Sequence, residues 1–144
     1  MALWPFGVHD REHPSLGVIL VVDDEESIRK VSRLALTKAG YEVLEAENGE
    51  KAIEVLNSGE NPLTVDVIIC DIRMPKINGV EAIKYFQTQY PSVKIVVQTG
   101  FPDLDLATSL MKQGIMDYLV KPVEKEKFLA AVANAVAQRT ICNT

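Results

Sequence analysis

Five polar side chains stand at the ends of predicted strands and together could form a binding site for a metal ion and an anion. They are three carboxylates, one hydroxyl and one ammonium: Asp23, Asp24, Asp71, Thr99 and Lys121. Carboxylates held close together repel one another and raise one another's pKa, and a bound divalent cation offsets that repulsion. Mg²⁺ takes oxygen ligands and often binds through one or two carboxylates together with a phosphate. The ammonium and the hydroxyl would complete a site for an anionic group that binds beside the metal.

The strand before Asp71 is the clearest structural signal near these residues. Residues 67–70 form an apolar run, which predicts a strand buried on both faces. A lone charge inside such a strand would be costly, so we expect Asp71 where the strand emerges, with Pro75 ending regular structure soon after. Ligands bind at this edge of open parallel sheets. Taken alone, Asp71 is explained equally well as the cap of the next helix.

The rest of the chain predicts five strands alternating with five helices. Strands are expected at residues 18–22, 41–46, 67–70, 93–97 and 116–120, and helices at 27–39, 48–56, 79–89, 103–113 and 124–138, with a loop at 58–62. This alternation, with short connections, predicts an α/β fold in which a parallel sheet carries helices on both faces, joined by right-handed crossovers. The carboxyl ends of all the strands then share one edge, so the five polar side chains become neighbours.

Helical spacing also predicts which side chains face the core. The apolar positions of helix 27–39 recur opposite its basic residues, and helix 79–89 has a clear inner face. Helix 103–113 is rather apolar, so most of its large apolar residues are expected in the core, with room left for a partner contact. These positions are Ile28, Val31, Leu34, Ala35 and Ala39 in the first helix, Val80, Ile83 and Phe86 in the second, and Leu104, Leu106, Leu110 and Met111 in the third.

Composition bounds the class of protein. The 144 residues are 47% hydrophobic and 24% charged, which is ordinary for one globular domain. No apolar run reaches the roughly 20 residues that a membrane span needs, and a net charge of -5 argues against direct nucleic-acid binding. Cys70 falls in a core strand and Cys142 near the end of the chain, so we expect no disulfide and a reducing, cytoplasmic location.

The two ends of the chain differ from its middle. Residues 1–16 are expected to be a disordered or vector-derived extension, although Trp4 and Phe6 are alternatively residues that dock on a groove or a partner. His9 and His13 are four apart, but Pro14 and the lack of a helical pattern argue against a metal site. We expect the domain at 17–138 and a tail at 139–144.

Five motifs in the expected order resemble one protein family. They are Val-Val-Asp-Asp-Glu at 21–25, Glu-Ala-Glu-Asn-Gly at 45–49, Ile-Ile-Cys-Asp-Ile-Arg-Met-Pro at 68–75, Thr-Gly at 99–100 and Asp-Tyr-Leu-Val-Lys-Pro at 117–122. Over residues 17–138 the chain resembles the chemotaxis-type receiver domain of two-component response regulators. The resemblance implies a flavodoxin-like sheet with strand order 2-1-3-4-5.

The resemblance also implies a role for each residue of the site. Asp71 would be the phosphoacceptor and would take a phosphoryl group from a phosphohistidine on a sensor kinase or a histidine phosphotransfer protein. Asp24 and Asp71 would bind Mg²⁺ directly, Asp23 mainly through water, and the backbone carbonyl of Arg73 would be the third protein ligand. Lys121 and Thr99 would bind oxygens of the phosphoryl group.

A conformational switch is implied by the same family. Thr99 would move toward the phosphoryl group, Tyr118 would rotate inward, and the face made by helix 103–113, strand 116–120 and helix 124–138 would change. That face would bind a downstream target or a second copy. The Lys121–Pro122 peptide would be cis. The protein would be a switch and not an enzyme, apart from catalysing its own phosphorylation and dephosphorylation.

Two residues near the expected site depart from the family, and other classes of protein are alternatives to it. Arg73 is a long cation two residues after the phosphoacceptor, and Phe101 is two residues after Thr99; both are expected to alter the lifetime of the phosphorylated state. One alternative is a receiver excised from a longer transcriptional regulator. An aspartyl-phosphate hydrolase would usually have a second acid where Arg73 stands. A nucleotide or flavin binder would need a glycine-rich loop in place of the acidic residues 23–26.

Overall fold

The computed structural model describes residues 15–73 and 79–142, with side chains described as far as Arg139. The expectations for residues 1–14, among them Trp4, Phe6, His9 and His13, lie outside these ranges, as does the one for Pro75. The division of the chain into an extension, a domain and a tail therefore stays a prediction.

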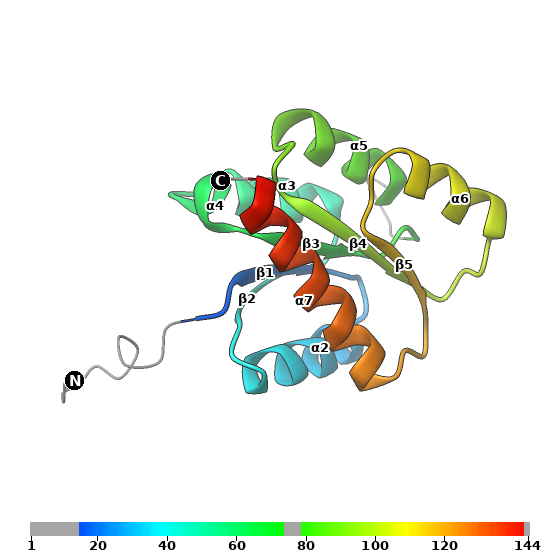
Figure 1. Cartoon of the computed structure of the whole chain (residues 1–144), viewed down its shortest axis with the longest axis horizontal. Coiled ribbons are helices and arrows are strands. Elements are labelled where there is room, and N and C mark those ends of the chain that lie inside the picture. The colour runs from blue at the N-terminus through cyan, green and yellow to red at the C-terminus, as the bar shows by residue number, and fades with distance from the viewer. Residues whose placement is uncertain (1–14, 74–78, 143–144) are drawn as a thin grey trace.

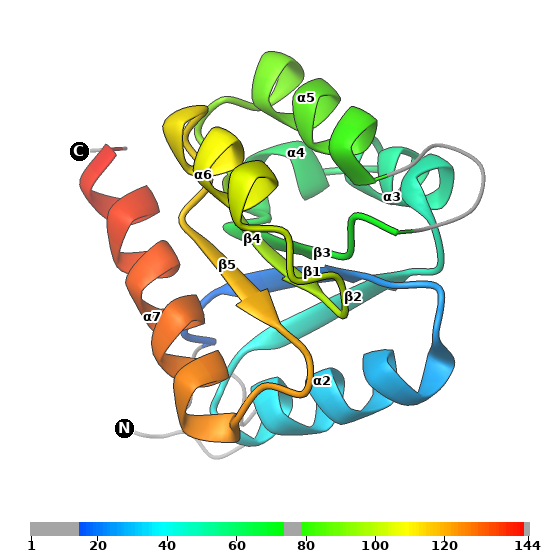
Figure 2. The same cartoon turned by 90° about the vertical axis from the view of Figure 1, so that its right-hand side faces the viewer.

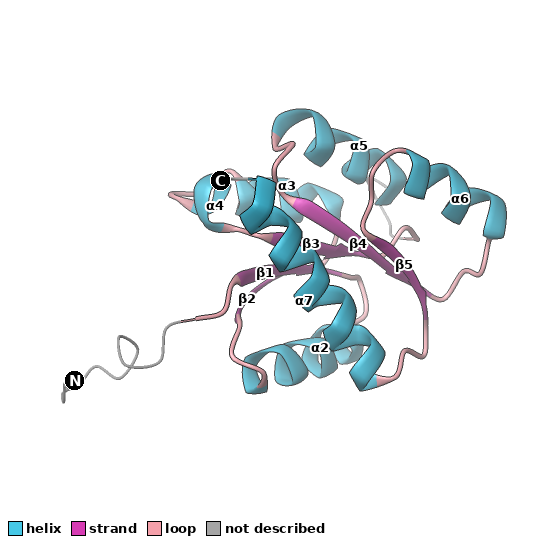
Figure 3. Ribbon diagram, viewed as in Figure 1, coloured by secondary structure: helices cyan, strands magenta, loops and turns pink. Residues whose placement is uncertain are grey.

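A parallel sheet forms the middle of the molecule (Figure 1; Figure 3). Its strands lie in the order β2-β1-β3-β4-β5, and every neighbouring pair is parallel. The predicted flavodoxin-like order is confirmed. The bounds of the strands are Val18–Val22 for β1, Glu42–Ala46 for β2, Val67–Cys70 for β3, Lys94–Thr99 for β4 and Asp117–Val120 for β5.

Helices cover both faces of this sheet, as Figure 2 shows most clearly. Helices α2 and α7 lie on one face, and α3, α5 and α6 lie on the other. The bounds are Glu26–Lys38 for α2, Gly49–Leu56 for α3, Asn61–Thr64 for α4, Gly79–Gln89 for α5, Leu104–Lys112 for α6 and Lys125–Cys142 for α7. Among the described residues, no helix is both long and apolar enough to cross a membrane.

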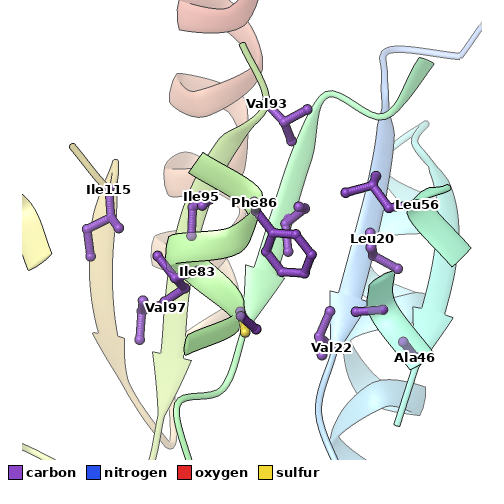
Figure 4. Close-up of a cluster of buried hydrophobic side chains, with 14 of the residues drawn as sticks. Leu20, Val22, Ala46, Leu56, Ile83, Phe86, Val93, Ile95, Val97 and Ile115 are labelled. Carbon is purple, nitrogen blue, oxygen red and sulfur yellow. The ribbon is translucent and has the colours of Figure 1, made fainter. Parts of the chain in front are cut away.

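Alternation along the central strands divides the core into two clusters. Ile19 and Val21 of β1 pack toward α2 and α7, whereas Leu20 and Val22 pack toward α3 and α5. Figure 4 shows the ring of Phe86 in the second cluster, with labelled side chains of β1 and β4 on either side. Full burial of each large apolar side chain contributes about 1.5 to 3 kcal/mol. The sheet is therefore a rigid support for the side chains at its edge.

The predicted inner faces of three helices are partly wrong. Val31 and Leu34 of α2 are exposed, and this helix buries Ser32 and Leu36 instead. A helix with apolar residues on several sides does not reveal from spacing alone which side meets the sheet. The predicted burial of Val80 in α5 is also wrong, because this side chain is exposed. In α6, Leu104 and Met111 lie on the surface, while Leu110 is buried as predicted.

Two further differences concern the bounds of elements. The expected loop at 58–62 runs into the one-turn helix α4, which has Pro62 in its first turn, where a missing N–H costs nothing. Helix α7 continues four residues past its predicted end at Gln138. Arg139 is buried there, and its guanidinium donates to the carbonyl of Leu63.

Candidate functional site

The carboxyl edge of the sheet brings four predicted site residues together. Asp23 follows β1, Asp71 follows β3, Thr99 ends β4 and Lys121 follows β5. Three of them are fixed by backbone bonds that continue the ladder: the N–H groups of Asp23, Asp71 and Lys121 donate to the carbonyls of Ala46, Val22 and Thr99. Asp23 and Asp71 are buried, at 1% and 5% exposed. Buried carboxylates need partners that offset the loss of water.

Lys121 is that partner. Its Nζ lies 2.7 Å from Oδ2 of Asp23 and 2.9 Å from Oδ2 of Asp71. A third acid, Glu25, places Oε1 3.5 Å away, with most of its side chain in solvent. Sequence reasoning assigned no role to Glu25, although it belongs to the acidic run after β1. One ammonium thus bridges the two buried carboxylates of the site.

The pKa directions follow from this bridge. Burial raises the pKa of Asp23, and the hydrogen bond and charge of Lys121 oppose that rise only in part. Burial by itself would lower the pKa of Lys121, but the bonds to Asp23 and Asp71 outweigh it and leave the pKa raised. The ammonium is therefore protonated at neutral pH in this arrangement.

The three aspartates form a set of oxygen donors that suits a hard cation. Carboxylate oxygens of Asp23, Asp24 and Asp71 all lie within 4.8 Å of one another. Asp24 is exposed, while the other two are buried. An all-oxygen set with an open side matches what Mg²⁺ requires, because that ion keeps several of its waters. The backbone N–H of Arg73 donates to Oδ1 of Asp71 at 2.9 Å. That the backbone carbonyl of Arg73 is a metal ligand stays a prediction.

A chain of contacts leads from this edge to Tyr118. The guanidinium of Arg73 stacks on the ring of Phe101, with 3.8 Å from Cζ to the ring centroid. The N–H of Phe101 donates to Oγ1 of Thr99 at 3.2 Å, and its carbonyl accepts the hydroxyl of Tyr118 at 2.7 Å. Tyr118 is half-buried, and burial raises its pKa. The structure therefore places Arg73, Phe101 and Tyr118 beside Thr99, and the Lys121–Pro122 peptide is cis.

Besides Glu25, two charged residues near the site were missed by sequence reasoning. Nη1 of Arg29 in α2 donates to the backbone carbonyl of Asp23 at 2.7 Å. Nε of the same side chain lies 3.3 Å from Oε1 of Glu45 in β2. Spacing had assigned Arg29 only to the solvent side of its helix. Glu45 lies in one of the recognised motifs, and nothing in that motif indicated an arginine partner.

An α/β protein of flavodoxin-like order, with an acidic site and a bridging lysine at its carboxyl edge, is the class that this geometry defines. A model of the "Response regulator receiver domain" family matches residues 19–133. The chain belongs to that family. Receiver domains act as signalling switches in two-component systems.

The similar curated proteins include transcriptional regulators. The DNA-binding transcriptional regulator NtrC of Escherichia coli is 38% identical over 84% of this chain and 25% of its own length. ZraR of Klebsiella oxytoca is 34% identical over 83% of this chain and 26% of its own length. The chain thus spans about a quarter of these curated relatives.

Solved structures of similar fold are matched over nearly their whole length. A receiver domain protein from Clostridium thermocellum has a TM-score of 0.81 at 32% identity, covering 88% of this chain and 98% of that one. A chemotaxis protein of Vibrio cholerae has a TM-score of 0.73 at 31% identity, covering 83% and 98%.

Proposed function

We propose that this protein is a phosphorylation-activated switch whose phosphoacceptor is Asp71. The observation that carries the proposal is the Asp71 carboxylate at the end of β3, bonded to Lys121 at 2.9 Å and within 4.8 Å of the other two aspartates. A nucleophilic carboxylate beside a fixed cation and a metal-type donor set is what phosphoryl transfer requires.

The transfer itself needs few parts from the protein. An oxygen of Asp71 attacks the phosphorus of a phosphohistidine on a sensor kinase or a phosphotransfer protein. The new P–O bond forms as the P–N bond breaks, and the imidazole leaves with that electron pair and takes a proton from solvent. In the later hydrolysis, water attacks the phosphorus, the P–O bond to Asp71 breaks, the carboxylate leaves with that electron pair, and a proton of the water goes to solvent. Lys121 supplies positive charge beside the oxygens in both steps.

Magnesium is the cofactor that these residues fit. Asp24 and Asp71 would bind it directly, Asp23 mainly through water, and the Arg73 carbonyl would be the remaining protein ligand. When bound, Mg²⁺ neutralises charge on the transferred group. The protein's own contribution is to hold the carboxylates and to present the ammonium of Lys121.

Switching would run through Thr99 and Tyr118. The hydroxyl of Thr99 accepts the Phe101 N–H in this structure, and it would donate its own proton to a phosphoryl oxygen. Movement of Thr99 toward that oxygen would shift Phe101, whose carbonyl holds the hydroxyl of Tyr118. Tyr118 would then rotate inward, which biases a two-state equilibrium.

The surface that would respond is made by α6, β5 and α7. A hollow of about 300 Å³ is lined there by residues of α6 and β5, including Leu104, Tyr118 and Val120. Leu104 and Val120 are exposed apolar side chains, and such side chains gathered at one place favour a protein contact. We propose a downstream target or a second copy of the chain as the partner.

Arg73 and Phe101 would set the lifetime of the phosphorylated state. Their stack joins the loop after β3 to the loop after β4, which carry the phosphoacceptor and Thr99. A stacked cation and ring at this position would shield the acyl phosphate from water or stabilise its charge. Either effect slows the loss of phosphate.

The proposal is tested by exposing the full chain to Mg²⁺ and acetyl phosphate and weighing it by mass spectrometry. We expect a gain of one phosphoryl group, which Asp71→Asn abolishes. Asp105→Asn changes an exposed aspartate of α6 and is the matched control that keeps the gain. No uptake by the wild type, or uptake that survives Asp71→Asn, would overturn the assignment.

A second candidate is a receiver that works as part of a longer transcriptional regulator. The similarity to regulators of which the chain spans about a quarter supports it. The chemistry at Asp71 would be unchanged, and DNA binding would belong to another domain. An aspartyl-phosphate hydrolase is disfavoured, because Arg73 stands where that class usually has its second acid.

A further inference from the structure

Asp23 is held at every polar atom that it has. Its N–H donates to the carbonyl of Ala46, and its Oδ1 accepts the N–H of Glu25 at 2.9 Å. Its Oδ2 accepts Lys121, and its carbonyl accepts Nη1 of Arg29, each at 2.7 Å. Asp24 is different: it is exposed, and its carboxylate makes no hydrogen bond to the other described residues. The position of Asp24 therefore depends on the backbone that precedes it.

The bond from Arg29 acts on that backbone. The carbonyl of Asp23 belongs to the peptide plane that joins Asp23 to Asp24, so a donor on this oxygen fixes the orientation of the plane. The orientation of the plane in turn sets where the side chain of Asp24 starts. Because the carbonyl is a main-chain group, no change of rotamer at Asp23 can replace this restraint.

Glu45 anchors the arginine. Its Oε1 lies 3.3 Å from Nε of Arg29, and its Oε2 lies 2.7 Å from Nη1 of Arg33, one helical turn further on. Glu45 pairs in register with Val21 of β1, so the backbone that carries this carboxylate is fixed by the sheet. The side chains of Arg29 and Glu45 are 16% and 27% exposed, against 41% for Arg33. Shielding from water makes the pair with Arg29 stronger than a surface ion pair.

We propose that Arg29, anchored by Glu45, is a positioning residue for the magnesium site. It holds the peptide between Asp23 and Asp24 so that the exposed carboxylate of Asp24 stays within reach of the buried pair. The inference rests on the magnesium site proposed above. Groups that orient metal ligands without touching the metal typically change its affinity 10- to 100-fold when they are replaced.

A purely electrostatic role and a positioning role for Arg29 predict opposite changes in Mg²⁺ affinity when Arg29 is replaced. Measuring that affinity therefore distinguishes the two roles. If Arg29 acted only as a cation near three carboxylates, its removal would leave the site more negative and Mg²⁺ would bind more tightly. If it positions Asp24, its removal weakens binding in spite of that gain. Arg33 shares the charge, the helix and the Glu45 partner, but it donates to no atom of residues 23 to 25 among its hydrogen bonds with described residues.

The experiment is a titration of the full chain with Mg²⁺ alone, without a phosphodonor. Binding is measured by isothermal titration calorimetry. We expect Arg29→Gln to weaken Mg²⁺ binding by about tenfold, and the control Arg33→Gln to bind Mg²⁺ as the wild type does or slightly more tightly. Circular dichroism checks that each variant is folded. Glu45→Gln removes the anchor and provides a second variant, which we also expect to bind more weakly.

Each outcome has a distinct meaning. Equal or tighter binding by folded Arg29→Gln overturns the inference, as does equal weakening by Arg33→Gln. If Arg29→Gln fails to fold, unchanged binding by Glu45→Gln overturns it. A wild type that does not bind Mg²⁺ overturns the proposed magnesium site and the inference with it. A wild type that binds, with unaffected Arg29 and Glu45 variants, refutes only the positioning role.

Discussion

The stack of Arg73 on Phe101 gives the sharpest prediction about the phosphorylated state. The guanidinium lies 3.8 Å from the ring centroid, well inside the range in which a cation over an aromatic face is attracted. Arg73 is exposed and Phe101 is half-buried, so the lower part of the usual energy range applies, about 0.5 to 1 kcal/mol. If that energy has to be given up before water reaches the acyl phosphate, hydrolysis is slowed about two- to fivefold.

The perturbation is a pair of single substitutions, Arg73→Ala and Phe101→Ala, together with the double variant. The bonds from Phe101 to Thr99 and Tyr118 use its backbone atoms, so the alanine variant removes the ring and keeps both bonds. Each protein is phosphorylated with acetyl phosphate and Mg²⁺, the donor is removed, and release of phosphate is followed with time.

We expect each single variant to lose phosphate about two to five times faster than the wild type, and the double variant to lose it no faster than either single one. Such non-additivity is the signature of two groups that act through one contact. Rates that multiply in the double variant would show that the two side chains act separately. Unchanged rates in both single variants would refute the shielding role outright.

Three other predictions follow from single contacts. A methyl group added at Gly79 would overlap the backbone of Asp71 and Ile72, so Gly79→Ala should cost about 1 to 3 kcal/mol in urea unfolding. The control Gly100→Ala, where an added methyl meets nothing, should be close to neutral. Tyr118→Phe removes the hydrogen bond to the carbonyl of Phe101 and should cost about 0.5 to 1.5 kcal/mol, and an unchanged unfolding midpoint would contradict it. Burial raises the pKa of the Cys70 thiol, so in a variant with no other cysteine a thiol reagent should react at pH 8 only after denaturant is added. The free energy of unfolding should also fall as the pH rises above about 8.5, because the thiol of the unfolded chain ionises there while the folded one does not.

The sheet and the main residues of the site could be predicted because their signals are local or topological. Apolar runs that end in acid mark β1 and β3, and a parallel sheet brings their ends to one edge whatever lies between them. Asp23, Asp71, Thr99 and Lys121 were found in this way, and the structure brings all four to that edge.

What the sequence did not reveal depends on directions and contacts in space. Val31 and Leu34 have the apolar character of core residues, yet α2 turns Ser32 and Leu36 to the sheet. The link from Arg29 to Glu45 joins a helix to the edge strand β2, and no periodicity in either element indicates it. The ring of Phe101 could be placed near the site by its spacing from Thr99, but its stacking on Arg73 depends on two loops meeting in space.

The bridge at Lys121 would let one edge of the sheet be stable both before and after the proposed phosphorylation of Asp71. In this structure the ammonium offsets the negative charge of Asp23 and Asp71 together. A bound divalent cation would offset the charge of the same carboxylates. If a cation binds these oxygens in place of the ammonium, Lys121 would give up at least one of these bonds. The Nζ of Lys121 already lies 2.9 Å from Oδ2 of Asp71, so it is at the edge where a phosphoryl group on Asp71 would bring new negative charge. On the proposed phosphorylation of Asp71, the cation that stabilises the resting site would thus become the one that binds the phosphoryl group.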